Sequence, residues 1–430
     1  MHERYFQNLD KVLKNSGICQ PTLVIDKQRL DQNIDHLKSV IDRGFDYRIV
    51  AKSLPSIPML RYIMERTGTR RLMSFHIPFL IQVAKEIPEA DVLLGKPMPI
   101  SAVNAFYQWY LSAQGAFDQQ SQLQWLVDSV ERLQEYEHFA KQHDLQLRIN
   151  LEINVGLNRG GFENPQSFDQ ALGLLQDSAH LTLSGLMGYE AHITKIPGFL
   201  GGPAKAFRKA MARYQDFVRQ ISDRFGHDVV KDLCLNAGGS TTFPLYKEQG
   251  VVNELATASA LVKPTDFDVY TLDHLEPAAF IATPILKDVS NPSLPMASEL
   301  SALLRKMGLS PKRGLFIYGG NWLASPCYPE KSKRADLLGH SSNQELYEVA
   351  VNHPIQRDDF MFFRPTQSEA LLLQFGELAV MDKGEIKEYW SVFHYPEQCP
   401  DAGANEALNK HFNKTLNTKK TINPEAGIRS

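Results

Sequence analysis

The sequence predicts an α/β protein with two parts: a parallel (β/α)8 barrel of the TIM type and a C-terminal, mostly-β domain. From about residue 45 to 265, short β-branched or apolar segments alternate with longer amphipathic ones, the pattern of repeated strand-helix units. After Pro264 the alternation stops and turn-separated, strand-like segments dominate. A chain of 430 residues also exceeds what one hydrophobic core usually supports, which favours two domains.

Eight strands are expected in the barrel region, at residues 47–51, 71–75, 91–95, 124–128, 146–155, 181–189, 234–237 and 251–262. Between them, apolar residues three and four apart predict helices at 57–66, 78–86, 101–111, 130–143, 167–176 and 204–225. Eight units over roughly 220 residues fit the size of a barrel. An open, doubly wound sheet is the structural alternative, but no GxGxxG motif follows an early strand.

Further elements are expected on either side of the barrel. A strand at 22–26 precedes an amphipathic helix, and the C-terminal half shows strand-like segments at 280–286, 314–319, 369–375, 378–381 and 386–393, with a helix near 298–307. The polar composition after Pro396 indicates a loosely held tail. The expected domains are therefore an N-terminal segment 1–26, a barrel 27–270, a β domain 271–395 and a tail 396–430.

The composition favours small-molecule chemistry in the cytoplasm. A formal net charge of −3 gives no large field to attract nucleic acid or an anionic membrane. The N-terminus lacks the apolar core of a signal peptide, and no apolar stretch is long enough to span a bilayer. Four widely spaced cysteines suit reduced thiols in a cytosolic protein better than a disulfide framework.

Lys52 ends the first expected barrel strand, and active sites of such barrels form at the carboxyl ends of the strands. A partly desolvated lysine at this position is able to form a Schiff base. A solvated strand end is the commoner role for such a lysine.

A segment rich in glycine and hydroxyl groups follows the seventh strand. Gly238, Gly239, Ser240 and Thr241 offer backbone N–H groups and hydroxyls that suit a phosphate. A tight turn with a Ser/Thr cap is the plainer alternative.

Polar residues also end the fifth and sixth strands. Arg159 lies in a glycine-rich loop and is able to clamp a carboxylate, whereas Tyr189 and His192 close the sixth strand. A strand-end lysine, an anion loop, an arginine and a histidine together suit a phosphorylated carbonyl compound that condenses with the lysine. Pyridoxal phosphate meets this description, and a sugar phosphate in a Schiff-base aldolase is the alternative.

Four segments in this order resemble fold-type III pyridoxal phosphate enzymes, and within them the D-threonine aldolase and D-serine dehydratase branch, which is related to alanine racemase. The segments are Val50-Ala-Lys-Ser53, Ile153-Asn-Val-Gly-Leu-Asn-Arg-Gly-Gly-Phe162, Gly185-Leu-Met-Gly-Tyr-Glu-Ala-His192 and Asn236-Ala-Gly-Gly-Ser-Thr-Thr242. The resemblance covers roughly residues 20–395 in layout, with strong motifs only in the barrel.

The resemblance implies a role for each candidate residue. Lys52 would bind the cofactor covalently and Gly238, Gly239, Ser240 and Thr241 would hold its phosphate, with Arg159 by its ring and Tyr189 and His192 beside it. The strand at 22–26 would join the β domain, and the protein would be a homodimer in which each β domain completes the partner's site. Tyr318, in Tyr318-Gly-Gly-Asn-Trp-Leu-Ala-Ser-Pro-Cys327, resembles the segment contributed there.

One departure from the family pattern leaves the metal open. The D-threonine aldolases and D-serine dehydratases carry a His-x-Cys or His-x-Asp pair that binds a divalent metal, and this chain has Gln367-Ser-Glu-Ala370 and His394-Tyr-Pro-Glu-Gln-Cys399 instead. The spacing of His394 and Cys399 does not match a metal-binding pair.

The expected function is a pyridoxal-phosphate-dependent lyase, an aldolase or dehydratase, that acts on a D- or β-hydroxy amino acid through a Lys52 Schiff base. Lys52 and His192 are the expected proton-transfer groups. Alternatives are an amino acid racemase, for which Tyr318, Tyr328 or Cys327 would be the second base, and a non-catalytic pyridoxal phosphate carrier.

Overall fold

The computed structural model describes residues 2–113, 115–292, 311–335 and 339–394. The helix expected near 298–307, the tail 396–430 and Cys399 lie outside these ranges. The described chain forms two compact units. The first unit contains residues 2–69, 238–249 and 256–393, within the described ranges, and the second contains 70–237, 250–255 and 394.

The expected barrel fold is confirmed: eight parallel strands close into a barrel in the order of the sequence. The strands are β2 (Asp46–Val50), β3 (Arg71–Ser74), β4 (Asp91–Leu94), β5 (Leu123–Val127), β6 (Leu147–Ile153), β7 (Leu181–Gly188), β8 (Cys234–Ala237) and β9 (Glu254–Thr257). Most of the predicted bounds differ from these by one or two residues, because the apolar runs that mark the strands are short and bounded by polar residues.

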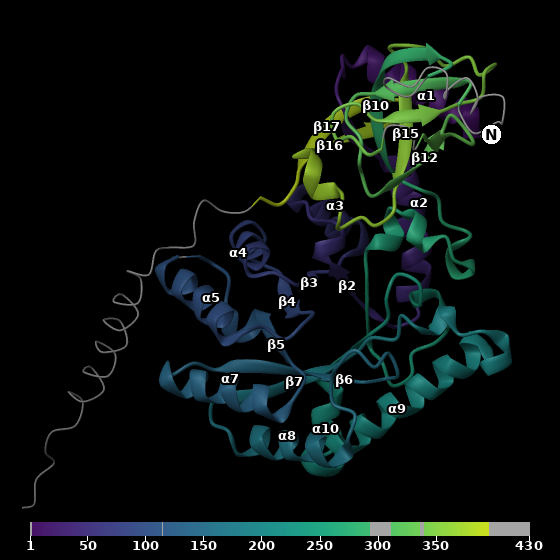
Figure 1. Ribbon diagram of the computed structural model, residues 1–430. Coiled ribbons are helices and arrows are strands. Elements are labelled where there is room, and N and C mark those ends of the chain that lie inside the picture. The colour runs from purple at the N-terminus through teal and green to yellow at the C-terminus, as the bar shows by residue number, and fades with distance from the viewer. Residues whose placement is uncertain (1, 114, 293–310, 336–338, 395–430) are drawn as a thin grey trace, which may run out of the picture. The chain divides into compact units, whose positions relative to one another are not determined.

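Helices of the second unit surround its strands on the outside (Figure 1). They are α4 (Ile77–Glu86), α5 (Ile100–Ser112), α6 (Gln119–Gln122), α7 (Val130–Gln142), α8 (Pro165–Asp177), α9 (Gly202–Phe225) and α10 (His227–Lys231). Side-chain caps fix where several of them begin: Ser129 accepts the Arg132 N–H at α7, and Asn164 accepts the Gln166 N–H at α8. These caps account for the close agreement with the predicted helices.

A buried polar cluster lies among the strands of the second unit. The Glu254 carboxylate is fully buried and accepts hydrogen bonds from Asn236 Nδ2 at 2.7 Å and Arg71 NH1 at 2.8 Å. Because a buried carboxylate is costly without such donors, these bonds hold β8 in register beside β9. The loop that follows β8 therefore starts from a fixed point.

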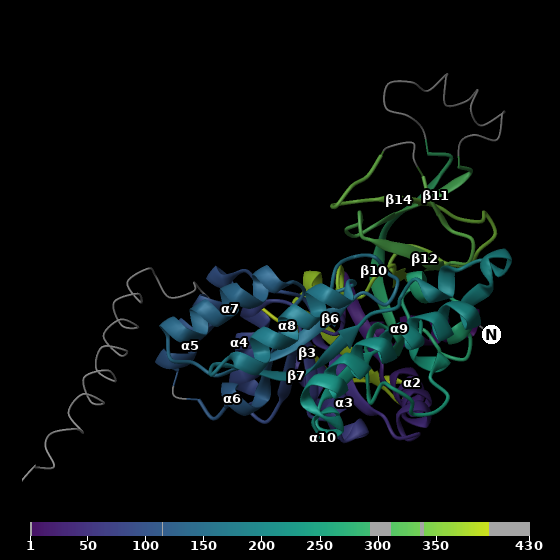
Figure 2. The ribbon, with the colours of Figure 1, turned by 90° about the horizontal axis from the view of Figure 1, so that it is seen from below.

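The first unit contains a nine-stranded sheet, with the order β13-β14-β11-β10-β1-β16-β17 and with β15 joining β10 to β12. Its strands are β1 (Thr22–Asp26), β10 (Ala279–Ser290), β11 (Arg313–Ile317), β12 (Ala324–Tyr328), β13 (Lys333–Arg334), β14 (Leu346–Glu348), β15 (Phe360–Pro365), β16 (Glu377–Asp382) and β17 (Glu385–Ser391). β1 runs antiparallel to β10 and parallel to β16. The second half of β10 continues into the ribbon formed with β11 and β14 (Figure 2).

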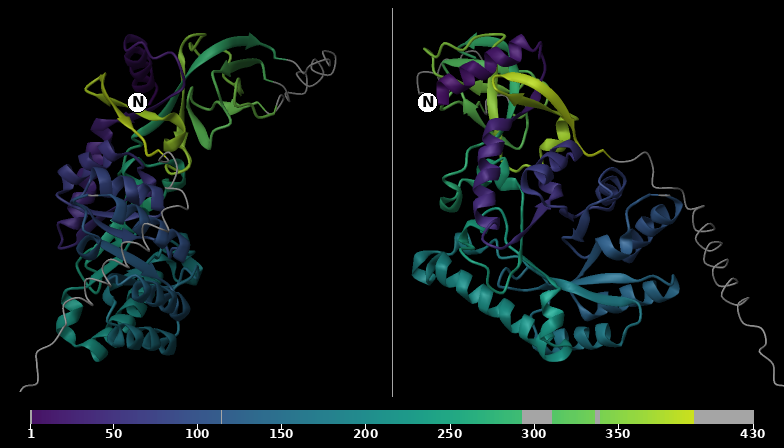
Figure 3. Two further views of the ribbon diagram at one scale, coloured as in Figure 1. Left: turned by 90° about the vertical axis from the view of Figure 1, so that its left-hand side faces the viewer. Right: turned by 180° about the vertical axis from the view of Figure 1, so that it is seen from behind.

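Among its described residues, the first unit contains three α-helices: α1 (His2–Asn15), α2 (Lys27–Ile41) and α3 (Ile57–Thr67). α1 was not among the predicted elements, and it lies against the sheet (Figure 3). Its Phe6 is buried with its ring centroid 5.3 Å from that of Phe280 and 5.0 Å from that of Phe362. Phe6, Leu9 and Leu13 are buried and recur three and four residues apart, so the sequence does carry the amphipathic pattern of this helix.

Two predicted strands are wrong in part or in whole. The strand expected at 251–262 ends at Thr257, and a 3-10 turn at Ser259–Leu261 (η5) follows, because the Ser240 hydroxyl draws in the Ala260 N–H at 3.1 Å. Residues 369–375 contain a 3-10 helix, η9 (Leu372–Phe375), instead of a strand. There the Ser368 carbonyl accepts the N–H groups of Leu371 and Leu372, which turns the chain. Nowhere in the described chain is a helix both long and apolar enough to cross a membrane.

Candidate functional site

Lys52 lies in a single 3-10 turn, η1 (Ala51–Ser53), directly after β2. Its neighbours Ala51 and Ser53 are buried, whereas its own side chain is 41% exposed. The turn therefore anchors the backbone and leaves the amine accessible. In the same unit, the Lys52 Nζ lies 3.6 Å from Glu369 Oε1.

The loop after β8 has the geometry of an anion site. Gly238 adopts a φ of 86°, a left-handed conformation that glycine accepts without steric cost. In the described part of the chain, the backbone N–H groups of Gly239, Ser240 and Thr241 donate to no protein acceptor. Consecutive free N–H groups after a turn of this kind form a concavity that binds phosphate.

The side chains of this loop are used mainly to hold its shape. Ser240 Oγ lies 2.9 Å from Thr257 Oγ1 and accepts the Ala260 N–H, and the Thr271 hydroxyl donates to the Thr241 carbonyl at 2.7 Å. At Ser240 and Thr241, the backbone N–H groups are therefore the groups most available to bind an anion.

In the second unit, the loop that carries Arg159 is built around Asn154. The Asn154 side chain accepts the N–H groups of Gly156 and Asn158 and donates to Glu163 at 2.9 Å. This side chain replaces the hydrogen bonds that a regular strand would supply, as in an Asx turn. It fixes the backbone on both sides of Arg159's loop.

The Arg159 side chain is 57% exposed and lies over the Tyr189 ring, 5.1 Å from guanidinium carbon to ring centroid. Its Nη2 lies 4.0 Å from Glu152 Oε1. Burial raises the pKa of Glu152, and the Arg159 charge partly offsets that rise. The sequence-predicted residues Arg159 and Tyr189 are thus in contact.

His192 is partly buried, and burial lowers its pKa, so the neutral ring is favoured near pH 7. Its Nδ1 is buried and has no hydrogen-bond partner among the described residues. A buried ring nitrogen of this kind is able to bond a water molecule or a ligand.

Tyr318 is the exposed member of the three second-base candidates, with 44% of its surface accessible. The turn that follows it is held by Glu345, which is 1% exposed and accepts the Asn321 N–H and the Tyr347 hydroxyl, each at 2.8 Å. A β-carbon on Gly320 would lie 2.4 Å from Glu345 Cβ, so only glycine fits there. The first unit thus presents the Tyr318 ring from a fixed turn.

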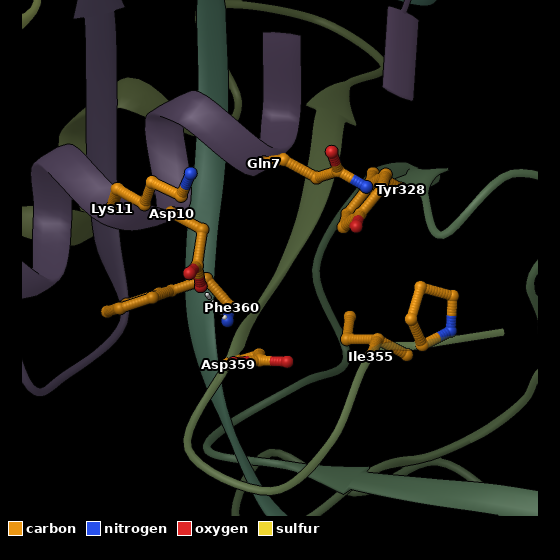
Figure 4. Close-up of a pocket in the computed structure, with 8 residues that line it drawn as sticks. Gln7, Asp10, Lys11, Tyr328, Ile355, Asp359 and Phe360 are labelled. Atoms are coloured by element: carbon orange, nitrogen blue, oxygen red, sulfur yellow. Dashed lines mark hydrogen bonds between the residues drawn. The ribbon is translucent and has the colours of Figure 1, made fainter. Parts of the chain in front are cut away.

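Burial works against proton transfer by Cys327 and Tyr328. Burial raises the pKa of the Cys327 thiol to about 12 and also raises the pKa of Tyr328. Tyr328 is 6% exposed, and Gln7 of α1 reaches toward its ring beside a cavity of about 200 Å³ (Figure 4). Of the predicted site residues, Lys52, the 238–241 loop and Tyr318 thus belong to the first unit, and Arg159, Tyr189 and His192 to the second.

Glu369 is a residue that the sequence analysis did not select as part of the site. It lies in a predicted strand that does not form, far from Lys52 in sequence. No local pattern could have identified it, because only folding brings the two side chains together.

Two features of the first unit fit pyridoxal phosphate: an accessible amine at Lys52, and consecutive backbone N–H groups at residues 239–241 that donate to no acceptor among the described residues. Within the described ranges, no group of three or more His, Cys, Asp and Glu side chains is placed to hold a metal ion.

Comparison with known proteins agrees with this fit. A family model described as the alanine racemase N-terminal domain matches residues 25–254. None of the curated proteins matches the sequence.

Several solved structures share the fold. D-threonine aldolase from Filomicrobium marinum is 16% identical with a TM-score of 0.67, covering 87% of this chain and 95% of that one. D-threo-3-hydroxyaspartate dehydratase from Delftia sp. HT23 is 13% identical with a TM-score of 0.64, covering 87% and 97%. Alanine racemase from Bacillus anthracis is 12% identical with a TM-score of 0.65, covering 87% and 98%. At these identities the likeness establishes the fold alone.

Proposed function

The chain belongs to the alanine racemase N-terminal domain family, a fold-type III pyridoxal phosphate family, and on this premise we propose that it is a lyase acting on a D- or β-hydroxy amino acid. The cofactor assignment rests on one observation: the accessible Lys52 amine and the free N–H groups of residues 239–241 belong to the same unit. The choice of a lyase follows the names of two structural neighbours, a D-threonine aldolase and a D-threo-3-hydroxyaspartate dehydratase.

Each residue has a proposed task. Lys52 would hold the cofactor through its amine and would carry a proton to or from the substrate. The loop Gly238–Thr241 holds the phosphate, and Arg159 and Tyr189 contact the ring. His192, neutral near pH 7, is able to accept a hydrogen bond or a proton at Nδ1. When bound, pyridoxal phosphate supplies an electron sink for the bond that breaks at the substrate α-carbon.

An amino acid racemase is the second candidate, because Tyr318 is exposed and could act as a second base. A racemase needs two bases on opposite faces of the substrate, and Tyr318 is an exposed ring held on a fixed turn. We propose that the protein is a homodimer in which Tyr318 of one copy completes the site of the other. The third candidate is a non-catalytic cofactor carrier. Such a carrier would not require the nine-stranded sheet whose strand β11 ends directly before Tyr318, and the sheet therefore counts against it.

The cofactor assignment is tested by Lys52→Ala, with Lys247→Ala, an exposed lysine of the same unit, as the matched control. Wild type and Lys247→Ala should bind pyridoxal phosphate with a visible absorbance band that borohydride converts to a stable adduct on Lys52. A borohydride-stable adduct of the cofactor that still forms in Lys52→Ala would rule out the assignment.

The reaction is tested by incubating the loaded protein with D- and L-amino acids, including β-hydroxy ones, with and without a chelator. A lyase yields an aldehyde plus glycine, or a keto acid plus ammonia, and a racemase yields only loss of optical rotation. A fall in turnover with chelator, restored by a divalent cation, would identify a metal requirement. Tight cofactor binding with no turnover of any amino acid would favour the carrier.

A further inference from the structure

The Lys52 amine lies beside a carboxylate, Glu369, whose position is fixed by hydrogen bonds to neighbouring residues. Glu369 is one-third exposed, and its Oε1 lies 3.6 Å from the Lys52 Nζ, which is within ion-pair range but longer than a hydrogen bond. Both side chains remain reachable by solvent. The pair therefore contributes little to folding stability. We look instead to the effect of the Glu369 carboxylate on the Lys52 amine.

Glu369 is itself connected to the anion loop by a row of hydroxyl groups. Its Oε2 lies 3.4 Å from the fully buried Ser368 hydroxyl, which hydrogen-bonds the buried Ser259 Oγ at 3.1 Å. Ser259 begins the turn whose next residue, Ala260, donates its N–H to Ser240 Oγ of the anion loop. All of these residues lie in the first unit.

This row places the carboxylate at a fixed position relative to the phosphate-binding N–H groups. Ser368 also anchors the 3-10 turn after Glu369, because its carbonyl accepts the N–H groups of Leu371 and Leu372. A shift of the anion loop would therefore be transmitted to Glu369 through buried hydrogen bonds rather than through mobile surface side chains.

A lysine that exchanges between a bound and a released state needs a defined place and charge when released. A carboxylate within about 4 to 6 Å favours the protonated form of an amine. A free, unpaired lysine at this site would instead sample many rotamers.

We propose that Glu369 is a positioning residue for Lys52: its carboxylate pairs with the released amine, restricts where that amine can go, and so sets how readily it reacts. The proposal rests on the proposed function, in which Lys52 is the amine that bonds the cofactor.

The test is trace acetylation of the full-length protein with acetic anhydride at fixed pH, with the labelling of Lys52 measured by mass spectrometry relative to Lys247. Because an amine held in an ion pair is less available to the reagent, Glu369→Gln should raise the Lys52 to Lys247 ratio about two- to fivefold, the range typical of a partly exposed ion pair. Glu369→Asp should stay closer to wild type because it keeps the charge.

Glu377→Gln is the matched control, since Glu377 is an exposed glutamate of the same unit at the start of β16. It removes the same charge and should leave the ratio unchanged. A ratio in Glu369→Gln equal to wild type, or an equal rise in Glu377→Gln, would overturn the proposal.

A second measurement keeps the test informative if Glu369→Gln fails to fold. Raising the salt concentration should increase the wild-type ratio, because salt screens an exposed pair. A wild-type ratio that does not respond to salt would count against Glu369. The labelling needs no cofactor, so loss of the Lys52 assignment and loss of the Glu369 role give separate results.

Discussion

Gly156 lies so close to the His192 ring that a β-carbon at this position would fit tightly against it. A β-carbon on Gly156 would lie 3.1 Å from His192 Nε2 and 3.3 Å from His192 Cε1, and Gly156 has a φ of 119° that side chains rarely adopt. The Arg159 loop and the His192 ring are therefore fitted to each other at this glycine.

Gly156→Ala should displace the His192 ring and strain the loop. The unfavourable φ alone is expected to cost about 1–3 kcal/mol of the free energy of unfolding. Urea denaturation measures this loss, and fluorescence titration with pyridoxal phosphate measures the accompanying fall in affinity. Gly198→Ala is the control, because Gly198 has open space around it and an ordinary φ. If both variants behave alike, the fit between Gly156 and His192 has no consequence.

His192 should make the stability of the protein depend on pH below about 6.5. Because burial lowers its folded-state pKa below the ordinary value of 6.5, the unfolded chain binds its proton first as pH falls. This contribution is present above pH 6.5 and is lost on acidification, by at most about 1.4 kcal/mol per pH unit.

Comparing His192→Gln with wild type at pH 7, 6 and 5 measures this contribution, and the variant should lose less free energy of unfolding. His353→Gln is a suitable control, since burial also lowers the pKa of His353 in the first unit. Both variants should flatten the stability profile, whereas only His192→Gln should change how cofactor affinity varies with pH.

Ser240→Ala should loosen the anion loop from within. It leaves the N–H of the fully buried Ala260 without its acceptor, which costs about 1–3 kcal/mol. Thermal unfolding with and without inorganic phosphate should show a lower melting temperature and a smaller rise on adding phosphate. Ser39→Ala, which removes an exposed hydroxyl from α2, should change neither quantity. If phosphate raises the melting temperature of Ser240→Ala as much as that of wild type, the Ser240 hydroxyl is not needed for anion binding by the loop.

Tyr318 and Tyr328 should respond in opposite ways to loss of their hydroxyls. Tyr318→Phe changes an exposed ring and should alter the free energy of unfolding by less than about 0.5 kcal/mol. If Tyr318 transfers a proton, turnover should fall by about 10²–10⁴-fold. Tyr328→Phe changes the buried core and should cost about 0.5–1.5 kcal/mol with turnover per folded molecule retained. Normal turnover in Tyr318→Phe would remove this tyrosine from the reaction.

The barrel could be predicted from the sequence because each of its elements carries a local signal. Alternating apolar segments mark the strands, and caps such as Ser129 and Asn164 mark helix starts. The confirmed fold class needs no more than this periodicity, since eight strand-helix units have few other ways to close.

One unpredicted element, α1, has a helical pattern of apolar residues at Phe6, Leu9 and Leu13 that could have identified it. The other unpredicted features depend on contacts between distant residues. The strand expected at 369–375 is a 3-10 turn because Ser368 is pulled toward Ser259. The pairing of Lys52 with Glu369 has no trace in either local sequence.

The position of β1 has a consequence for the order of folding. Leu23 is paired with Ile281 on one side and with Leu378 on the other, so this early strand is completed only by segments made much later. Pairings of such high contact order form slowly, because a long loop must close before they gain stability. During synthesis the apolar residues 22–26 would therefore remain unpaired until the ribosome has made β10 and β16. We expect this interval to be the stage at which the nascent chain depends most on chaperones.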